Sequence, residues 1–287
     1  MPLRWLYAIS TFVAFVLRSV LHYRRDVIIQ NLSRSFPELK YKEIKSITNK
    51  FYKHFADVFT EVLKSISISR NNLRNRFKVE NPELIIQYYK DNRNIIGLTG
   101  HIANWEWMSI IPSLYPFQCF TLYKPLRSKL AESLMTSIRR RFGMKLLPMT
   151  NAARFILSNK ENKAFYIFIG DQSPAKVENA TIFEFLHQPT TFFTGGAKLA
   201  RATKAAVVYI SIRKVKRGYY SVRFIPIVTP DLSASREVTS NVALQPSGME
   251  GSNDIETSIL SSYARLLETD IRANPVNWLW SHKRWKH

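Results

Sequence analysis

A histidine and a glutamate stand five positions apart at the end of an apolar run, in the stretch Leu98–Ser109 (LTGHIANWEWMS). A regular helix turns about 100° per residue, so His101 and Glu106 would point in different directions on one helix. If His101 lies in the turn after a strand and Glu106 on the next helix, the turn can bring the imidazole against the carboxylate. A carboxylate that accepts from Nδ1–H leaves Nε2 free to take a proton, as a general base does when an alcohol attacks an acyl carbon. The alternative is that His101 caps the helix and Glu106 is a solvated surface residue; spacing alone favours this alternative, because such pairs are common by chance.

Two further polar clusters follow apolar segments of strand length. Tyr123–Arg127 follows the segment 117–123, and Asp171–Ser173 follows the segment 163–169. Strands separated by helices predict an α/β fold with a mixed, mostly parallel central sheet flanked by helices. In such sheets active residues gather at the carboxyl ends of strands, where all three clusters are expected. Strands are expected at 94–98, 117–123, 163–169 and 205–212, a hairpin partner at 220–224, and helices at 105–114, 128–142, 195–203 and 255–273.

The N-terminal region carries an apolar segment, Trp5–Leu17, which is shorter than the ~20 residues of a spanning helix. Basic residues close it, which favours a membrane anchor or an interfacial helix with its basic side in the cytoplasm. A buried amphipathic helix is the alternative. We expect an N-terminal membrane-anchoring helical hairpin over residues 1–70 and one catalytic domain over residues 71–287, with a polar surface loop at 230–254. A helix that begins near Lys42 is expected to have one apolar face, formed by Phe51, Phe55, Val58, Phe59, Val62, Leu63 and Ile66.

Charge is the most unusual feature of the composition. Lys and Arg number 42 against 21 Asp and Glu, which gives a net charge of +21 over 287 residues and indicates an anionic partner. The basic residues are spread over the whole chain without a nucleic-acid-binding motif, so nucleic acid is not the expected partner. The single cysteine, Cys119, excludes an internal disulfide and is interpreted as structural. The sequence has neither metal-ligand spacing nor a glycine-rich phosphate loop, so neither a metal nor a cofactor is expected.

The stretch His101–Trp107 (HIANWEW) resembles the His-x4-Asp/Glu signature of glycerolipid acyltransferases. More narrowly it is similar to the lauroyl/myristoyl acyltransferases of lipid A biosynthesis, which typically read His-x-Gly-Asn-Trp-Glu, with Ala103 here in place of the glycine. Members of the family usually carry a longer apolar stretch ahead of the PLRW at residues 2–5, so the chain is expected to be shortened at its N-terminus. Six further blocks match in the order of the family: Tyr23–Glu38, Tyr123–Pro125 (YKP), Arg139–Gly143 (RRRFG), Asp171–Pro174 (DQSP), Thr194–Ala200 (TGGAKLA) and Trp278–Lys286 (WLWSHKRWK).

The resemblance implies transfer of an acyl chain from a thioester to a hydroxyl, without an acyl-enzyme. His101 would take the proton and Glu106 would hold the imidazole and support its positive charge. Within the Arg139–Arg141 cluster the resemblance favours the first and last arginines, while a solvated basic helix face is the alternative for either of them. The substrate-binding residues expected from the resemblance are Asn104, Lys124, Arg139, Arg141, Asp171 and Gln172.

The resemblance also implies partners that account for the charge. The expected acyl donor is carried on acyl carrier protein, which is acidic, or on coenzyme A. The expected acceptor is a phosphate-bearing glycolipid, most simply a lipid A precursor in lipopolysaccharide synthesis, at the cytoplasmic side of the inner membrane. Long-range attraction would draw both to a basic surface. Another acceptor lipid, or a catalytically silent membrane-binding homologue, remains as an alternative.

Overall fold

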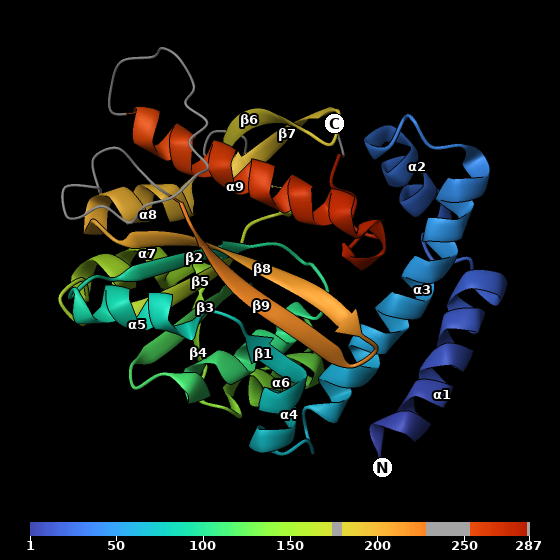
Figure 1. Ribbon diagram of the computed structural model, residues 1–287, viewed down its shortest axis with the longest axis horizontal. Helices are drawn as coiled ribbons and strands as arrows, with labels where there is room; N and C mark the ends of the chain where they lie inside the picture. The colour runs from blue at the N-terminus through green and yellow to red at the C-terminus, as the bar shows by residue number, and fades with distance from the viewer. Residues whose placement is uncertain (174–179, 228–252, 286–287) are drawn as a thin grey trace.

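Seven strands form the central sheet, in the order β1-β9-β8-β2-β5-β3-β4, with helices on both faces (Figure 1). Every pairing is parallel except that of β8 with β9, which confirms a mixed, mostly parallel sheet. The computed structural model describes residues 1–173, 180–227 and 253–285. The strands of the sheet are β1 (Phe77–Val79), β2 (Ile95–Thr99), β3 (Gln118–Tyr123), β4 (Lys145–Pro148), β5 (Ala164–Ile169), β8 (Ala206–Lys216) and β9 (Tyr219–Pro226), and a separate antiparallel hairpin consists of β6 (Ala180–Phe185) and β7 (Gln188–Phe193).

The helices begin and end close to the expected residues where the apolar period is clear. The 3₁₀ helix η2 occupies 105–114, and α6 is capped by Ser128, whose Oγ accepts from the Ala131 N–H at 3.4 Å. Most of the polar segment 230–254 lies outside the described residues. The helices are α1 (Leu3–Phe15), continued by the π-helical turn η1 (Val16–Val20), then α2 (Arg25–Ser35), α3 (Tyr41–Lys64), α4 (Arg70–Arg76), α5 (Pro82–Lys90), η2 (Trp105–Leu114), α6 (Lys129–Arg140), α7 (Met149–Ser158), α8 (Gly195–Thr203), α9 (Asn253–Ala273) and the 3₁₀ turn η5 (Pro275–Asn277).

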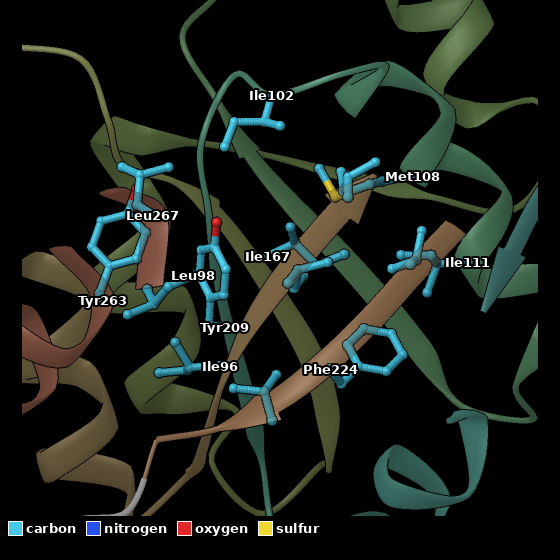
Figure 2. Close-up of a cluster of buried hydrophobic side chains, with 14 of the residues drawn as sticks. Ile96, Leu98, Ile102, Met108, Ile111, Ile167, Tyr209, Phe224, Tyr263 and Leu267 are labelled. Atoms are coloured by element: carbon cyan, nitrogen blue, oxygen red, sulfur yellow. The ribbon is translucent and has the colours of Figure 1, made fainter. Parts of the chain in front are cut away.

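The core fills both faces of the sheet, as Figure 2 shows. Leu98 of β2 and Tyr209 of β8 point toward Leu267 of α9, whereas Ile167 of β5 points to the opposite face, toward Met108 of η2 (Figure 2). All five residues of β2 are buried, because a parallel strand covered on both faces takes a continuous apolar run. The sheet is therefore a rigid base for the loops that follow β2 and its neighbours.

The amphipathic pattern predicted for α3 is wrong in part. Phe51 and Val58 are buried, but Phe59 is 58% exposed, as are other members of the expected apolar face, Leu63 (54%) and Ile66 (52%). The face turned to the protein combines apolar residues with polar side chains, because His54, Asp57 and Glu61 are buried on it as well. The reason is that α3 packs against α1 and passes the site loop after β2, and both contacts use hydrogen bonds (Figure 1).

The N-terminal segment Leu3–Val20 is, among the described residues, the one helix long and apolar enough to cross a membrane, with a mean hydropathy of 1.3. Only 17% of it is buried in the protein, so the alternative of a buried amphipathic helix is wrong for most of its surface. Its exposed side chains include Trp5 (58%) and Phe12 (67%). The segment fits a membrane-associated helix, as the sequence predicts. The core is continuous from α2 and α3 into the sheet, and the division into 1–70 and 71–287 stays a prediction.

Candidate active site

A cavity of 440 Å³ opens at the carboxyl ends of β2, β3 and β5, which are neighbours in the sheet. All three clusters predicted from the sequence contribute to it: His101 and Glu106 after β2, Lys124 after β3 and Gln172 after β5. Parallel strands bring their carboxyl ends to one edge, so residues far apart in the sequence meet there. The apolar part of its lining includes Met108, Leu122, Met144, Met149, Ile167 and Ile169.

Asp171 holds the imidazole of His101. Its Oδ1 lies 2.6 Å from Nδ1 of His101, and its Oδ2 accepts from the His101 backbone N–H at 2.8 Å and from Nε1–H of Trp278 at 2.7 Å. Burial alone would raise the pKa of the Asp171 carboxyl, but the neighbouring imidazole and these hydrogen bonds outweigh burial and lower the pKa to about 2. Asp171 is therefore ionised and only 3% exposed, and it requires a hydrogen on Nδ1. Nε2 is left on the cavity side, 3.3 Å from Nε2 of Gln172.

The loop between β2 and η2 approaches Asp171 closely, and Gly100 makes this approach possible. A Cβ at Gly100 would lie 2.6 Å from Cδ1 of Leu267 and 3.0 Å from Oδ2 of Asp171, so a side chain there would displace one of them. Ala103 has a left-handed φ of 52° and donates its N–H to the Asn277 carbonyl at 2.8 Å. The C-terminal segment thus fixes the turn that aims His101.

Glu106 does not contact the imidazole, and the expected His101–Glu106 hydrogen bond is corrected by the structure. Its carboxylate instead accepts two hydrogen bonds from Arg139, at 2.8 Å from Nε and 2.6 Å from Nη2. Burial would lower the pKa of Arg139, but this bidentate pairing raises it above its ordinary value. Glu106 lies in the first turn of η2 while His101 lies before it, and the turn directs Nδ1 of the ring toward Asp171 in the loop after β5. The carboxylate of Asp171, in the loop after the neighbouring strand β5, therefore has the role that was predicted for Glu106.

The remaining predicted substrate-binding residues divide into two groups. Lys124, Arg139 and Gln172 line the cavity, where Arg127 joins them. Asn104 and Arg141 do not line it, so their placement does not support contact with substrate. Asn104 is fully buried and caps η2, and Arg141 donates to the backbone carbonyls of Ser65 (2.5 Å) and Ile68 (2.6 Å) after α3.

Glu61 of α3 is a residue that the sequence pattern did not reveal. It is fully buried, and its carboxylate accepts from Tyr7 of α1, Tyr220 of β9 and Asn104 of the site loop, each at 2.7 Å. Burial raises its pKa, against the effect of these donors. Only its position within an otherwise apolar stretch of α3 could have marked it. Through Asn104 it ties the N-terminal helix to the loop that carries His101.

The described residues supply neither a reactive cysteine nor a metal-binding cluster at the site. Burial raises the pKa of the Cys119 thiol to about 12, so this cysteine is a poor nucleophile. Within the described ranges, no group of three or more His, Cys, Asp or Glu side chains is arranged to hold a metal ion. The cavity therefore combines the oriented imidazole of His101, a cationic wall formed by Lys124, Arg127 and Arg139, and an apolar lining.

The sequence as a whole is similar to known proteins. Residues 1–287 match the family model described as bacterial lipid A biosynthesis acyltransferase. A lipid A biosynthesis acyltransferase of Haemophilus influenzae is 24% identical over 224 residues, which cover 75% of this chain and 70% of that protein. A lipid A biosynthesis palmitoleoyltransferase of Escherichia coli is 20% identical over 278 residues, which cover 97% and 84%.

Proposed function

This chain belongs to the bacterial lipid A biosynthesis acyltransferase family, and we propose that it transfers acyl chains from a thioester directly to a hydroxyl of a lipid A precursor with His101 as general base. The observation that carries the mechanism is the imidazole of His101, which the ionised Asp171 fixes at Nδ1 and which lines the 440 Å³ cavity. Its Nε2 has the side-chain amide of Gln172 at 3.3 Å, a contact that the acceptor hydroxyl would replace. The same arrangement supports proton transfer without a covalent intermediate, since the described residues place no activated nucleophile beside it.

In the proposed reaction, Nε2 of His101 removes the proton of the acceptor hydroxyl as its oxygen attacks the thioester carbon. The tetrahedral intermediate then collapses, the carbon–sulfur bond breaks, and the proton passes from the imidazolium to the leaving thiolate. Asp171 stabilises the imidazolium, because its carboxylate keeps a negative charge 2.6 Å from Nδ1. The acyl tail would lie along the apolar wall formed by side chains such as Met108 and Ile167.

The cationic wall suits the anionic parts of both substrates. Lys124, Arg127 and Arg139 line the cavity, and Glu106 neutralises one of these charges. Glu106 occupies the Nε and Nη2 edge of Arg139, so only the remaining N–H groups of this guanidinium would be available to a phosphate. Lys124 and Arg127 supply the charge that no carboxylate neutralises among the described residues. Phosphates of the glycolipid acceptor would contact this wall. Asn104 and Arg141 lie outside the cavity and would only hold neighbouring backbone in place.

We assign the donor to acyl carrier protein and the catalytic domain to the cytoplasmic face of the inner membrane. The net charge of +21 supports an acidic carrier protein and an anionic membrane over an uncharged partner. The exposed apolar helix Leu3–Val20 supports attachment at the membrane, with the sheet outside it. Coenzyme A thioesters share the chemistry and serve as the competing donor in the assay.

The test uses the full chain in uncharged detergent, with acyl carrier protein and coenzyme A thioesters and a lipid A precursor as acceptor. We expect His101→Ala to lower kcat by ~10²–10⁴-fold, because general-base catalysis contributes that much. His187→Ala, which changes an exposed histidine outside the cavity, is the matched control and should keep wild-type activity. Thermal unfolding of both variants must match that of the wild type. A folded His101→Ala variant with ordinary turnover would refute the mechanism.

A further inference from the structure

A second cavity, of 390 Å³, lies between the end of the N-terminal helix, α2 and α3. Its charged and polar lining includes Arg18 and Ser19 of η1, Arg25 of α2, and Lys45 and Asn49 of α3, with His22 in the turn. We call it the basic cavity. None of these residues lines the cavity that holds His101, so the two sites are separate.

A tight turn between η1 and α2 assembles the basic cavity. His22 and Arg24 both have left-handed backbone angles, with φ of 48° and 51°, although neither is glycine. The turn is held by the Tyr23 N–H, which donates to the Leu17 carbonyl at 2.9 Å, and by the Tyr52 hydroxyl, which donates to the Tyr23 carbonyl at 2.8 Å. This fixed reversal brings basic side chains of α2 to the same hollow as those of η1 and α3.

The cations of the basic cavity form no ion pair within the described part of the chain, although Nε of Arg18 donates to the Ser19 hydroxyl at 3.1 Å. Arg18, Arg25 and Lys45 carry three positive charges, and none of the described residues that line the cavity is acidic. No carboxylate among the described residues lies within salt-bridge distance of these three cations. Like charges gathered in one hollow repel one another, and a bound anion would relieve this repulsion. Hydroxyl and amide groups of Ser19 and Asn49 add hydrogen-bonding groups suited to an oxyanion.

Exposed apolar side chains border the same turn. Phe15, Val20 and Leu21 are 51%, 62% and 63% exposed, and they close the apolar segment Leu3–Val20. One face of this helix packs on α3, and its exposed face can lie against a membrane. The basic cavity at the end of the helix then lies at the level of the lipid head groups.

We propose that the basic cavity binds the phosphate of an anionic phospholipid, whose acyl chains lie against the exposed apolar end of the N-terminal helix. The inference rests on the proposed attachment of that helix to the membrane, but not on the acyl-transfer reaction. Arg18 and Arg25 supply guanidinium groups for the phosphate oxygens, and Lys45 supplies a third charge. The bound lipid would fix the end of the anchor relative to α3.

The experiment measures lipid binding to the full chain in uncharged detergent micelles by native mass spectrometry. The probes are dioctanoyl phosphatidylglycerol, dioctanoyl phosphatidylcholine and inorganic phosphate as competitor. The triple variant R18Q/R25Q/K45Q removes three positive charges from the basic cavity. The control triple variant K78Q/K90Q/R154Q removes three charges from exposed residues elsewhere.

We expect the cavity variant to bind phosphatidylglycerol at least about tenfold more weakly than the wild type, and the control variant to stay within about threefold. Equal losses in both variants would show diffuse attraction and overturn the proposal, as would unchanged binding by the cavity variant. Inorganic phosphate that competes as well as the lipid would overturn the lipid assignment in favour of a free anion. Acyl transfer on soluble substrates, measured in parallel, should be unchanged in the cavity variant. Failure of the wild type to transfer acyl groups would refute the proposed reaction and leave the lipid result standing.

Discussion

His101 is the residue whose chemistry depends most on its neighbours. Its imidazole contacts a carboxylate at Nδ1, lies with its ring centroid 5.0 Å from that of Trp105, and is 17% exposed toward the cavity. A ring held on one side and open on the other can exchange a proton only through Nε2. Of the two carboxylates at the site, Asp171 contacts this residue and Glu106 pairs with Arg139 instead.

The substitutions Asp171→Asn and Glu106→Gln are therefore expected to lower kcat for different reasons. Asp171→Asn places an amide N–H against donors from His101 and Trp278, so kcat should fall by ~10²–10⁴-fold. Glu106→Gln acts by loosening Arg139, so the double variant with Arg139→Gln should be no less active than Arg139→Gln alone. Steady-state kinetics of the single and double variants measures both effects. Equal, additive losses from Glu106→Gln and Arg139→Gln would contradict this assignment.

Ala103 is a second residue with a specific expectation. Its φ of 52° costs about 1–2 kcal/mol for a residue with a Cβ, whereas glycine adopts it freely. Ala103→Gly should therefore leave the unfolding midpoint unchanged or raise it, because relief of strain offsets the greater freedom of the unfolded chain. Ala103→Val should lower stability by more than about 2 kcal/mol, since a β-branched residue is poorly tolerated there and the site is fully buried. Thermal unfolding compares the three chains, and a stable Ala103→Val variant would contradict the strain argument.

Among the elements, α3 has the unusual role of a helix with a polar buried face. Asp57 accepts from Ser10 of α1 at 2.6 Å and pairs with Arg217 after β8, while Glu61 accepts from Tyr7 and Asn104. Buried polar networks are specific only when every member is satisfied, so they fix one relative placement of α1, α3 and the site loop. A purely apolar interface would allow α1 to slide along α3.

The link between α3 and the site loop can be tested at Asn104. Asn104→Ala removes the cap of η2, worth about 1 kcal/mol, and takes one donor from the buried Glu61, worth about 1–3 kcal/mol. We expect a lower unfolding midpoint together with a lower kcat, because the same loop carries His101. Asn75→Ala, at an exposed position of α4, is the control and should change stability by less than about 0.5 kcal/mol. If Asn104→Ala lowers neither stability nor kcat, the loop is held by other contacts.

For the whole molecule, two buried titratable groups predict how stability depends on pH. Burial and the nearby Lys214 lower the pKa of His54 to about 3, below its ordinary value of 6.5. The unfolded chain therefore binds a proton between these values that the folded chain does not, and stability falls as pH falls from 6.5 toward 3. Asp171 acts at lower pH, because its pKa is lowered from 3.8 to about 2 and its contribution is lost across that window.

The expected sizes are on the order of 5 kcal/mol for His54 and about 2 kcal/mol for Asp171. Unfolding in uncharged detergent, measured from pH 7 to pH 2, checks both. His54→Gln should flatten the slope between pH 6.5 and 3, and Asp171→Asn should flatten it only below about pH 4. A wild-type chain equally stable at pH 7 and pH 4 would contradict the assignment to His54.

The sequence by itself determined the alternation of strands and helices and the three clusters at strand ends. These features depend on local patterns: an apolar run such as Ile95–Thr99 has few alternatives, and polar residues after it must lie at the edge of a sheet. The block matches also identified the family, because order and spacing along a chain are properties of sequence. The exposure of the N-terminal helix likewise followed from its composition.

Only the tertiary structure decided which carboxylate contacts His101. The resemblance to the acyltransferase signature favoured Glu106, five residues away, over Asp171, which is 70 residues away. The pairing of β2 with β5 places Thr99 beside Ile169, and the two following loops then share one edge of the sheet. The buried polar face of α3 was hidden for the same reason, since its partners Tyr7, Asn104 and Tyr220 come from three distant segments. Hydrogen bonds between side chains depend on distances in space, and a helical or strand period does not encode them.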